Sequence, residues 1–365
     1  MKTHDYYKTL TDKPYTLSKT SDIYQNINYD FEKHLHYNEI EKLINNLNKS
    51  DSTIISVIGS SVDKRSIYSI EIGYGSNTIL FDAGIHAAEV AGPLFIIKYL
   101  IDLVNDYENN EDEAINIINN YKIIIIPCIN PDGYEATLFG TKYINNKNLY
   151  IYQNRKDIIF KTYKGNANGV DLNRNFPSQH GGLYYSNNIL NETVSLEPTL
   201  GYFDYFPGTR LGSEPETKAV MSWLENNLNN ASAYISLHSA GRVIYSGKPN
   251  LSAAFNNKSL RLAKIVSQVN NYTAYDKTEE EVGYGNDGTS TDYASEIISD
   301  FKFSKKTGRL SASSYQNPKI KEVINTGIIT LETLSEYTFD LNIIKEEYYN
   351  QKLYKVFTKL IKNQE

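Results

Sequence analysis

The chain has 365 residues, of which 40% are hydrophobic and 22% are charged, and its formal net charge is −6. This apolar content is enough to bury one large core or two smaller ones. The negative net charge and the lack of a concentrated basic run exclude an ordinary nucleic-acid-binding surface, because duplex binding needs a basic footprint. The single cysteine, Cys128, excludes an internal disulfide and a thiolate zinc site, and it lies in an apolar run typical of a core.

The sequence shows no pattern of a secretory signal or of a membrane span. Residues 1–10 lack the apolar stretch that a signal peptide requires. Residues 90–104 form the longest apolar segment, and a glycine, a proline and two charged residues interrupt it. We therefore expect a cytoplasmic protein without a membrane partner, with a spore-associated location or non-classical export left open.

The first half of the chain predicts a surface extension followed by a domain that begins with a helix and three strands. Residues 1–34 are polar and rich in tyrosine, and we expect them to extend over a catalytic domain of residues 35–365. Apolar spacing and turn residues then predict, in order, a helix over 37–48, strands over 53–58, 66–72 and 78–85, a helix over 88–104 and a buried strand over 121–126.

The second half continues this alternation after a long polar region over residues 130–207, a length that is usually functional or inserted. The remaining predicted elements are a helix over 214–228, a strand over 232–237, a helix over 253–269, a loop over 276–292, a strand over 327–331 and a helix over 343–361. Strands that alternate with helices predict an α/β/α sandwich, in which a mixed parallel and antiparallel sheet has helices on both faces.

Two of the predicted strands lead into side chains that bind metals. His86 ends one of them, and Glu89 follows three residues later in the expected first turn of the next helix. His238 ends another apolar strand, and ligands of open α/β sheets bind at the carboxyl ends of strands. Two imidazoles and one carboxylate, with a position left for water, are typical of a catalytic zinc site. We therefore expect one Zn²⁺ per chain, with His180 as the alternative third ligand.

Several motifs, in chain order, resemble those of the carboxypeptidase A family of zinc peptidases, the funnelins. His86-Ala-Ala-Glu89 is similar to the family's His-x-x-Glu zinc motif, and Ser-Leu-His-Ser over 236–239 to its third-ligand motif. Residues 130–134 resemble its Asn-Pro-Asp-Gly turn, and residues 169–177, Gly-Val-Asp-Leu-Asn-Arg-Asn-Phe-Pro, resemble its substrate-carboxylate segment. The resemblance covers residues 37–340.

This resemblance implies a catalytic role for two further residues. Glu332, in a segment similar to the strand that delivers the catalytic glutamate, would be the general base that takes a proton from zinc-activated water. Glu336 lies nearby and is the alternative base. Arg155 resembles the arginine that stabilises the developing oxyanion.

The resemblance also implies how the substrate would be held. Asn173 and Arg174 would bind its free carboxylate, and a planar guanidinium suits a bidentate grip. Tyr284 resembles the mobile tyrosine that closes over the bound C-terminus. Asp171 resembles the carboxylate that orients a ligand histidine. Arg242, just after the third-ligand motif, is either a solvated loop residue or a partner for an acidic or zwitterionic side chain.

Departures from the animal enzymes favour a bacterial branch of the family, which includes γ-D-glutamyl-diaminopimelate peptidases. Ala88 stands where animal carboxypeptidases carry an arginine, and the separation of Asp292 from Glu332 indicates an inserted segment near 301–317. We expect a zinc metallocarboxypeptidase whose substrate is a peptide or a muropeptide with a free carboxylate. The alternatives are a zinc amidohydrolase that deacylates N-acyl amino acids, and a binding module without catalysis, which the four residues His86, Glu89, His238 and Glu332 argue against.

Overall fold

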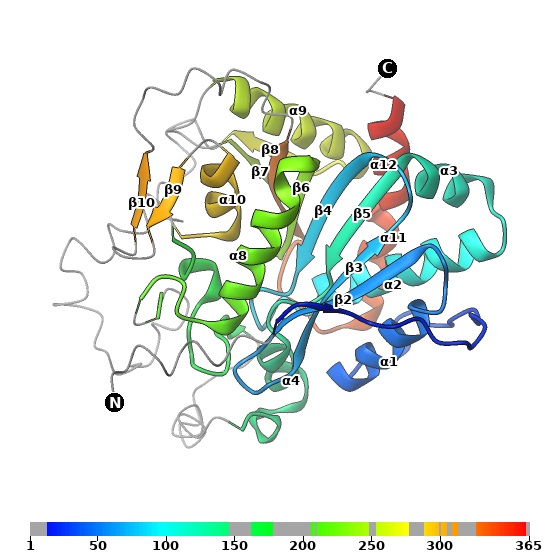
Figure 1. Ribbon diagram of the computed structural model, residues 1–365, viewed down its shortest axis with the longest axis horizontal. Helices are drawn as coiled ribbons and strands as arrows, with labels where there is room; N and C mark the ends of the chain where they lie inside the picture. Colours follow the sequence, from blue (N-terminus) through cyan, green and yellow to red (C-terminus); the bar gives the residue numbers. More distant parts are fainter. Residues whose placement is uncertain are drawn as a thin grey trace.

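The computed structural model describes residues 13–145, 162–177, 206–208, 210–247, 253–276, 288–298, 301–304, 309–312 and 326–362. A nine-stranded sheet crosses the molecule in the order β1-β2-β3-β5-β4-β6-β11-β7-β8 (Figure 1). Its strands are β1 (Tyr15–Thr16), β2 (Thr53–Ser60), β3 (Ser66–Ile72), β4 (Asn77–Ala83), β5 (Tyr121–Ile126), β6 (Ala231–Ser239), β7 (Val243–Ser246), β8 (Thr273–Asp276) and β11 (Gly327–Thr333).

Helices cover both faces of this sheet (Figure 1). They are α1 (Tyr37–Leu47), α2 (Ala91–Glu108), α3 (Asp112–Asn120), α4 (Pro131–Phe139), α8 (Pro215–Asn227), α9 (Ala253–Asn270), α10 (Ser290–Ile298), α11 (Leu341–Gln351) and α12 (Leu353–Lys362). Short 3₁₀ turns are η2 (Thr141–Tyr143), η4 (Leu172–Arg174) and η6 (Leu228–Asn230).

The four central strands β5, β4, β6 and β11 are neighbours and run parallel to one another. The pairs β1–β2, β2–β3, β3–β5 and β11–β7 are antiparallel, so the sheet is mixed. The predicted α/β/α fold is therefore confirmed. Because parallel neighbours end at the same edge, the residues that follow β4, β6 and β11 meet on one side of the molecule.

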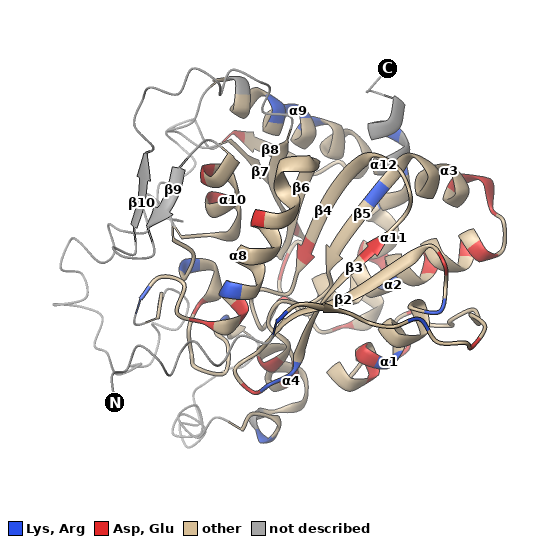
Figure 2. Ribbon diagram, in the orientation of Figure 1, with Lys and Arg blue, Asp and Glu red and all other residues tan. Residues whose placement is uncertain are grey.

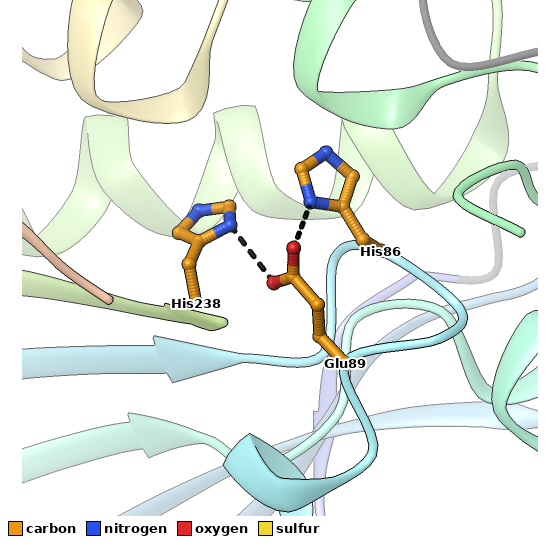
Figure 3. A group of neighbouring side chains, drawn as sticks. All are labelled: His86, Glu89 and His238. Atoms are coloured by element: carbon orange, nitrogen blue, oxygen red, sulfur yellow. Dashed lines mark hydrogen bonds and ion pairs between the residues drawn. The ribbon is translucent and has the colours of Figure 1, made fainter. Parts of the chain in front are cut away.

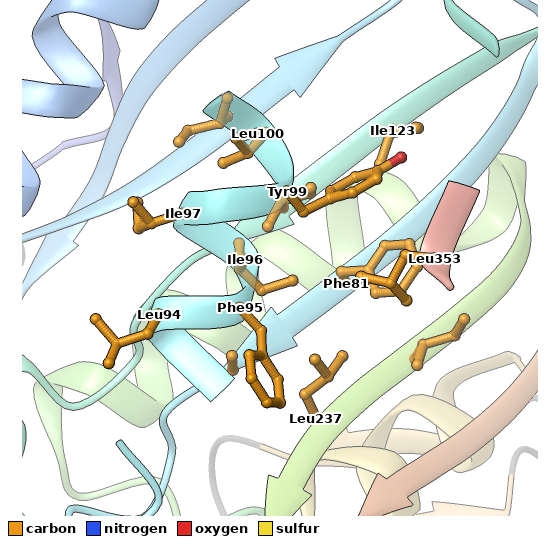
Figure 4. Close-up of a cluster of buried hydrophobic side chains, with 14 of the residues drawn as sticks. Phe81, Leu94, Phe95, Ile96, Ile97, Tyr99, Leu100, Ile123, Leu237 and Leu353 are labelled. Carbon is orange, nitrogen blue, oxygen red and sulfur yellow. The ribbon is translucent and has the colours of Figure 1, made fainter. Parts of the chain in front are cut away.

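Successive residues of the central strands point to opposite faces and so enter two separate cores. Phe81 and Leu237 belong to the larger core, which α1, α2, α3, α9, α11 and α12 cover. Leu80 and Tyr234 belong to the smaller core, which α8 and α10 cover. Figure 4 shows the larger core, where side chains of α2 such as Phe95 pack towards the strands.

The start of α2 differs from the prediction and affects the site. The helix begins at Ala91 rather than at residue 88, so Glu89 lies in the turn ahead of the helix and not in its first turn. The N–H groups of Ala87 and Ala88 donate hydrogen bonds to the carbonyls of residues 164 and 163. These bonds hold both residues in the loop ahead of the helix. Proline is favoured in the first turn of a helix, and Pro93 is the third residue of α2.

Other boundaries and elements also differ from the predictions. The C-terminal helix is divided into α11 and α12, because Lys352 takes a left-handed conformation with φ of 50°. The elements α3, α4, α10, β7 and β8 were not predicted, and α10 begins inside the span expected to be a loop. In the segment expected to be an insertion, β9 (Phe301–Ser304) and β10 (Arg309–Ala312) pair as a separate antiparallel ribbon.

The described part of the N-terminal segment, residues 13–34, is packed against the domain. Its strand β1 pairs with β2, and the hydroxyl of Tyr24 donates to Asn105 of α2 at 2.6 Å. The ring of Phe31 lies 6.3 Å from that of Phe95 and 5.4 Å from that of Tyr348 in α11, measured between centroids. This segment therefore joins α2 to the C-terminal helices, and the proposed domain boundary at residue 35 stays a prediction.

Charged residues of both signs are interspersed over the described helices and loops (Figure 2). Among these described residues, no helix has the length and apolar character needed to cross a membrane.

We expect the Phe31→Ala variant to lower the free energy of unfolding by about 3 to 5 kcal/mol, because it leaves a cavity between α2 and α11. The matched control is Ile23→Ala in the same segment: Ile23 is 85% exposed whereas Phe31 is 3% exposed. The control should change the free energy by less than about 0.5 kcal/mol. Denaturant unfolding measures both, and equal small effects would mean that the segment adds nothing to the core.

Candidate active site

The loop after β4 carries two of the predicted metal ligands, and backbone bonds to residues 163 and 164 hold it. The N–H of Ala88 donates to the carbonyl of Tyr163 at 2.7 Å, and the N–H of Ala87 donates to that of Lys164 at 3.3 Å. The N–H of Glu89 donates to the carbonyl of His86 at 3.3 Å, which closes the turn between these two residues. Their spacing is thus set by backbone contacts and not by a helix.

The Asn-Pro-Asp-Gly motif supports the same loop from the other side. The backbone N–H of Asn130 donates to the carbonyl of Gly84 at 2.9 Å, and its side-chain amide donates to the carbonyl of Gly165 at 3.0 Å. The side-chain oxygen of Asn130 accepts from the N–H of Gly133 at 2.9 Å and caps α4. This asparagine therefore links α4 and residue 165 to the loop that carries His86.

His86, Glu89 and His238 converge at the carboxyl ends of β4 and β6 (Figure 3). The Nδ1 atom of His86 lies 2.7 Å from Oε1 of Glu89, and Nδ1 of His238 lies 3.0 Å from Oε2. The two imidazole rings are 5.0 Å apart between centroids. All three side chains are buried, and each offers a ligand atom within 4.8 Å of the others.

The opposite nitrogen of each imidazole faces a second polar group. Nε2 of His86 lies 3.3 Å from Oδ1 of Asp171, which is the residue predicted to orient a ligand histidine. Nε2 of His238 lies 3.3 Å from the hydroxyl of Ser236. In both rings Nδ1 is therefore the nitrogen directed towards the shared centre.

The charges of this cluster perturb one another strongly. Burial alone would lower the pKa of His86, but the carboxylates of Glu89 and Asp171 outweigh burial and raise this pKa to about 9. Burial would raise the pKa of Glu89, and the two imidazoles reverse that effect and hold it well below its ordinary range. In the metal-free protein the cluster thus keeps a buried anion beside a cationic imidazole.

These donors suit zinc. Two imidazole nitrogens and one carboxylate form a ligand set of catalytic zinc sites, with ligand distances of about 2.0 to 2.2 Å. Two such ligands of one tetrahedral ion lie roughly 3.4 Å apart. The contacts of 2.7 and 3.0 Å around Glu89 need only a small expansion to admit the ion. A polar partner at Nε2, such as Asp171 for His86 and Ser236 for His238, is the arrangement that fixes ligand imidazoles in other zinc proteins.

Glu332 lies beside this cluster because of strand register. It is the partner of His238 across the parallel pair β11–β6, so both side chains are on the same face of the sheet, the face of α8 and α10. A methyl group placed on Gly241 would come within 3.0 Å of Oε2 of Glu332, so the carboxylate lies against this glycine. The alternative base, Glu336, is exposed beyond the end of β11.

Asn173 and Arg174 are buried in η4, the turn that begins after Asp171. The side-chain oxygen of Asn173 accepts from the N–H of Ser290 at 3.0 Å, and Nη1 of Arg174 donates to the carbonyl of Asn173 at 2.8 Å. Gly288, with φ of 84°, packs so closely that a methyl group there would lie 2.8 Å from the carbonyl oxygen of Arg174. The start of α10 thus holds this turn beside the metal ligands.

Three predicted residues, Arg155, Tyr284 and the alternative ligand His180, lie outside the described residues. Arg242 is described, and its guanidinium pairs with the buried Glu347 of α11 at 2.6 Å. Arg242 therefore forms a structural contact between the β6–β7 turn and α11.

The sequence reasoning missed Asp82, which is fully buried and accepts hydrogen bonds from the hydroxyls of Tyr234 and Ser236. Burial raises the pKa of Asp82, and the two hydroxyls and His238 oppose this shift. A signal was present, because Asp82 is the one carboxylate of its strand and follows the apolar run Ile79-Leu80-Phe81, four residues before His86. Such a group needs partners, and these come from a strand that is distant in sequence.

Comparisons with known proteins show the family to which this chain is similar. A model of the zinc carboxypeptidase family matches residues 40–333. Carboxypeptidase B2 of Rattus norvegicus is 29% identical over 232 residues, which cover 60% of this chain and 49% of that protein. Gamma-D-glutamyl-L-diamino acid endopeptidase 1 of Lysinibacillus sphaericus is 29% identical over 232 residues, covering 62% of this chain and 55% of its own length. The chain thus spans about half the length of these two relatives.

The fold also matches solved structures. The structure of bovine thrombin-activatable fibrinolysis inhibitor in complex with tick carboxypeptidase inhibitor superposes with a TM-score of 0.63 at 22% sequence identity. The match covers 91% of this chain and 99% of that one. At this identity the likeness shows the shared fold alone.

We expect zinc binding to strengthen as the pH rises from about 7 to about 8.5, because only a neutral imidazole binds the metal. His86 keeps its proton until the pH approaches about 9, so zinc must displace that proton. The apparent Kd should therefore fall about tenfold per pH unit in this range. Titration of metal-free protein against a competing chelator measures it, and a constant Kd would contradict the raised pKa.

Proposed function

The chain belongs to the zinc carboxypeptidase family, and on that premise we propose that it hydrolyses the peptide bond that precedes a C-terminal residue. The match over residues 40–333 confirms the family that the motifs indicated. The observation that carries the proposal is the convergence of His86, Glu89 and His238, with Glu332 in register beside His238. The proposal is supported by a carboxylate, Glu332, on the same face of the sheet as His238, one of the three potential metal ligands.

The proposed chemistry divides between the metal and the protein. A zinc ion bound here supplies Lewis-acid polarisation of the scissile carbonyl and makes a water more acidic. Glu332 takes a proton from the attacking water and passes it to the leaving amine as the carbon–nitrogen bond breaks. Asp171 keeps the His86 ring oriented through its contact with Nε2. Arg155 remains a proposed oxyanion stabiliser.

We propose that Arg174 and Asn173 bind the free carboxylate of the substrate. Both lie in the turn that begins at Asp171, whose carboxylate contacts His86, so a carboxylate held there is next to the reaction site. The oxygen of Asn173 already accepts from Ser290, which leaves its amide NH₂ as the group that can donate to an anion. Tyr284 is the proposed residue that closes over the bound end.

The substrate class is either an ordinary peptide or a cell-wall peptide with a γ-D-glutamyl-diaminopimelate bond. One relative bears the name gamma-D-glutamyl-L-diamino acid endopeptidase, which favours testing the second class. In both substrate classes the released residue carries a free carboxylate, so Arg174 could bind the carboxylate of either one. Parallel assays with γ-D-glutamyl-diaminopimelate peptides, ordinary peptides and N-acyl amino acids separate them. Hydrolysis of the N-acyl amino acids alone would replace the peptidase proposal with an amidohydrolase.

The Glu332→Gln variant should lose activity by about 10²- to 10⁴-fold and keep its zinc, because it removes the base but no metal ligand. Glu336→Gln is the matched control and should retain wild-type activity, since Glu336 is exposed beyond β11. Hydrolysis rates and the zinc content of purified protein are the measurements. An active Glu332→Gln variant, or an inactive Glu336→Gln variant, would show that the base is misassigned.

The Arg174→Ala variant should lower kcat/KM for peptides with a free C-terminus by about 10- to 100-fold, the value of a hydrogen bond to a charged group. C-terminally amidated peptides, which carry no negative charge to bind, should be cleaved slowly by both proteins. Arg261→Ala removes an exposed arginine from α9 and serves as the control. If Arg174→Ala keeps the preference for the free carboxylate, another cation binds it.

A further inference from the structure

A row of polar side chains runs along one face of β6 towards the metal site. Tyr234, Ser236 and His238 alternate with apolar residues, so all three point to the face of α8 and α10. The strand β4 lies beside β6, and Asp82 is the register partner of Ser236. The carboxylate of Asp82 therefore lies on the same face as this row.

Asp82 holds both hydroxyls of the row. The Ser236 hydroxyl donates to Oδ1 of Asp82 at 2.6 Å, and the Tyr234 hydroxyl donates to Oδ2. Asp82 and Ser236 are each 0% exposed, so water does not compete for these bonds. Each oxygen of the Asp82 carboxylate thus accepts one hydrogen bond, and each hydroxyl is the donor.

The Ser236 hydroxyl has one proton, and its direction determines whether the hydroxyl donates to His238 or accepts from it. Because the proton points to Asp82, the oxygen presents lone pairs to Nε2 of His238 at 3.3 Å. The proton of the neutral imidazole is then favoured on Nε2, and the lone pair of the ring is on Nδ1. That nitrogen faces Glu89 and the shared centre of the three ligands.

We propose that Asp82 and Ser236 are positioning residues for the metal ligand His238, with Asp82 acting through the hydroxyl of Ser236. His86 contacts the carboxylate of Asp171 directly, whereas His238 contacts a carboxylate through one intervening hydroxyl. The two ligand rings are thus oriented by two separate acidic residues. This inference rests on the proposed zinc site.

The Ser236→Ala variant tests the link, because it removes the hydroxyl and leaves the Asp82–Tyr234 bond in place. The matched control is Ser69→Ala: Ser69 is a buried serine of β3 that accepts from Trp223 at 2.9 Å and lies away from the site. The measurements are the zinc Kd, from competition with a chromophoric chelator, and the melting temperature of the metal-free protein.

Ser236→Ala should bind zinc about 10- to 100-fold more weakly than the wild type, as is usual when a partner of a ligand imidazole is lost. Ser69→Ala should keep the wild-type Kd while its melting temperature falls. An unchanged zinc Kd in a folded Ser236→Ala protein would overturn the proposal, because the serine would then be merely structural.

Asp82→Asn provides a second variant if Ser236→Ala does not fold. It keeps the size of the side chain but replaces one accepting oxygen by an NH₂ donor, so the direction of the serine proton is no longer fixed and zinc binding should again weaken at least about tenfold. A wild-type Kd in this variant also overturns the proposal. The two levels of failure are separable: wild-type protein that binds no zinc contradicts the proposed function, whereas unaltered variants contradict only the role of Asp82 and Ser236.

Discussion

The buried carboxylate of Glu89, shared between two imidazoles, is the interaction on which the site depends. Its two oxygens contact Nδ1 of His86 at 2.7 Å and Nδ1 of His238 at 3.0 Å. A buried carboxylate is unfavourable without such partners, so each imidazole is needed to keep the charge in place. The contacts hold only if the ends of β4 and β6 are adjacent, and the parallel pairing of these strands provides this.

The same pairing explains why the other functional groups gather on one face. Side chains two residues apart on a strand share a face, and register partners on neighbouring strands share it as well. This rule explains the positions of four residues, since Asp82 pairs with Ser236 and Glu332 pairs with His238, two residues along the same strand. The opposite face of these strands is apolar and is covered by α2 and the C-terminal helices. Both faces of the sheet are covered by a hydrophobic core, and the proposed catalytic groups lie only on the face of the smaller one.

The sequence predicted those features that depend on local pattern. The strand over 121–126 was predicted with its exact bounds, because an uninterrupted apolar run between polar residues has few alternatives. The predicted start of α2 was wrong because the N–H groups of Ala87 and Ala88 donate to the carbonyls of residues 164 and 163. Local pattern cannot indicate such a contact between distant segments. Asp82 was missed for the same reason: its hydroxyl partners are more than 150 residues away in the chain.

The order of the strands has a consequence for how the protein reaches its native state. The strands β4 and β6 are neighbours in the sheet, yet β5 and the helices α2, α3, α4 and α8 lie between them in the chain. Contacts between such distant segments form slowly, because the entropy of closing a long loop is lost before the contacts contribute any stability. A zinc ion held by His86, Glu89 and His238 would join those two segments and act as a cross-link across that loop, because it would bind the folded chain and not the unfolded one. Zinc binding by these three residues would therefore require that β4 and β6 have already paired.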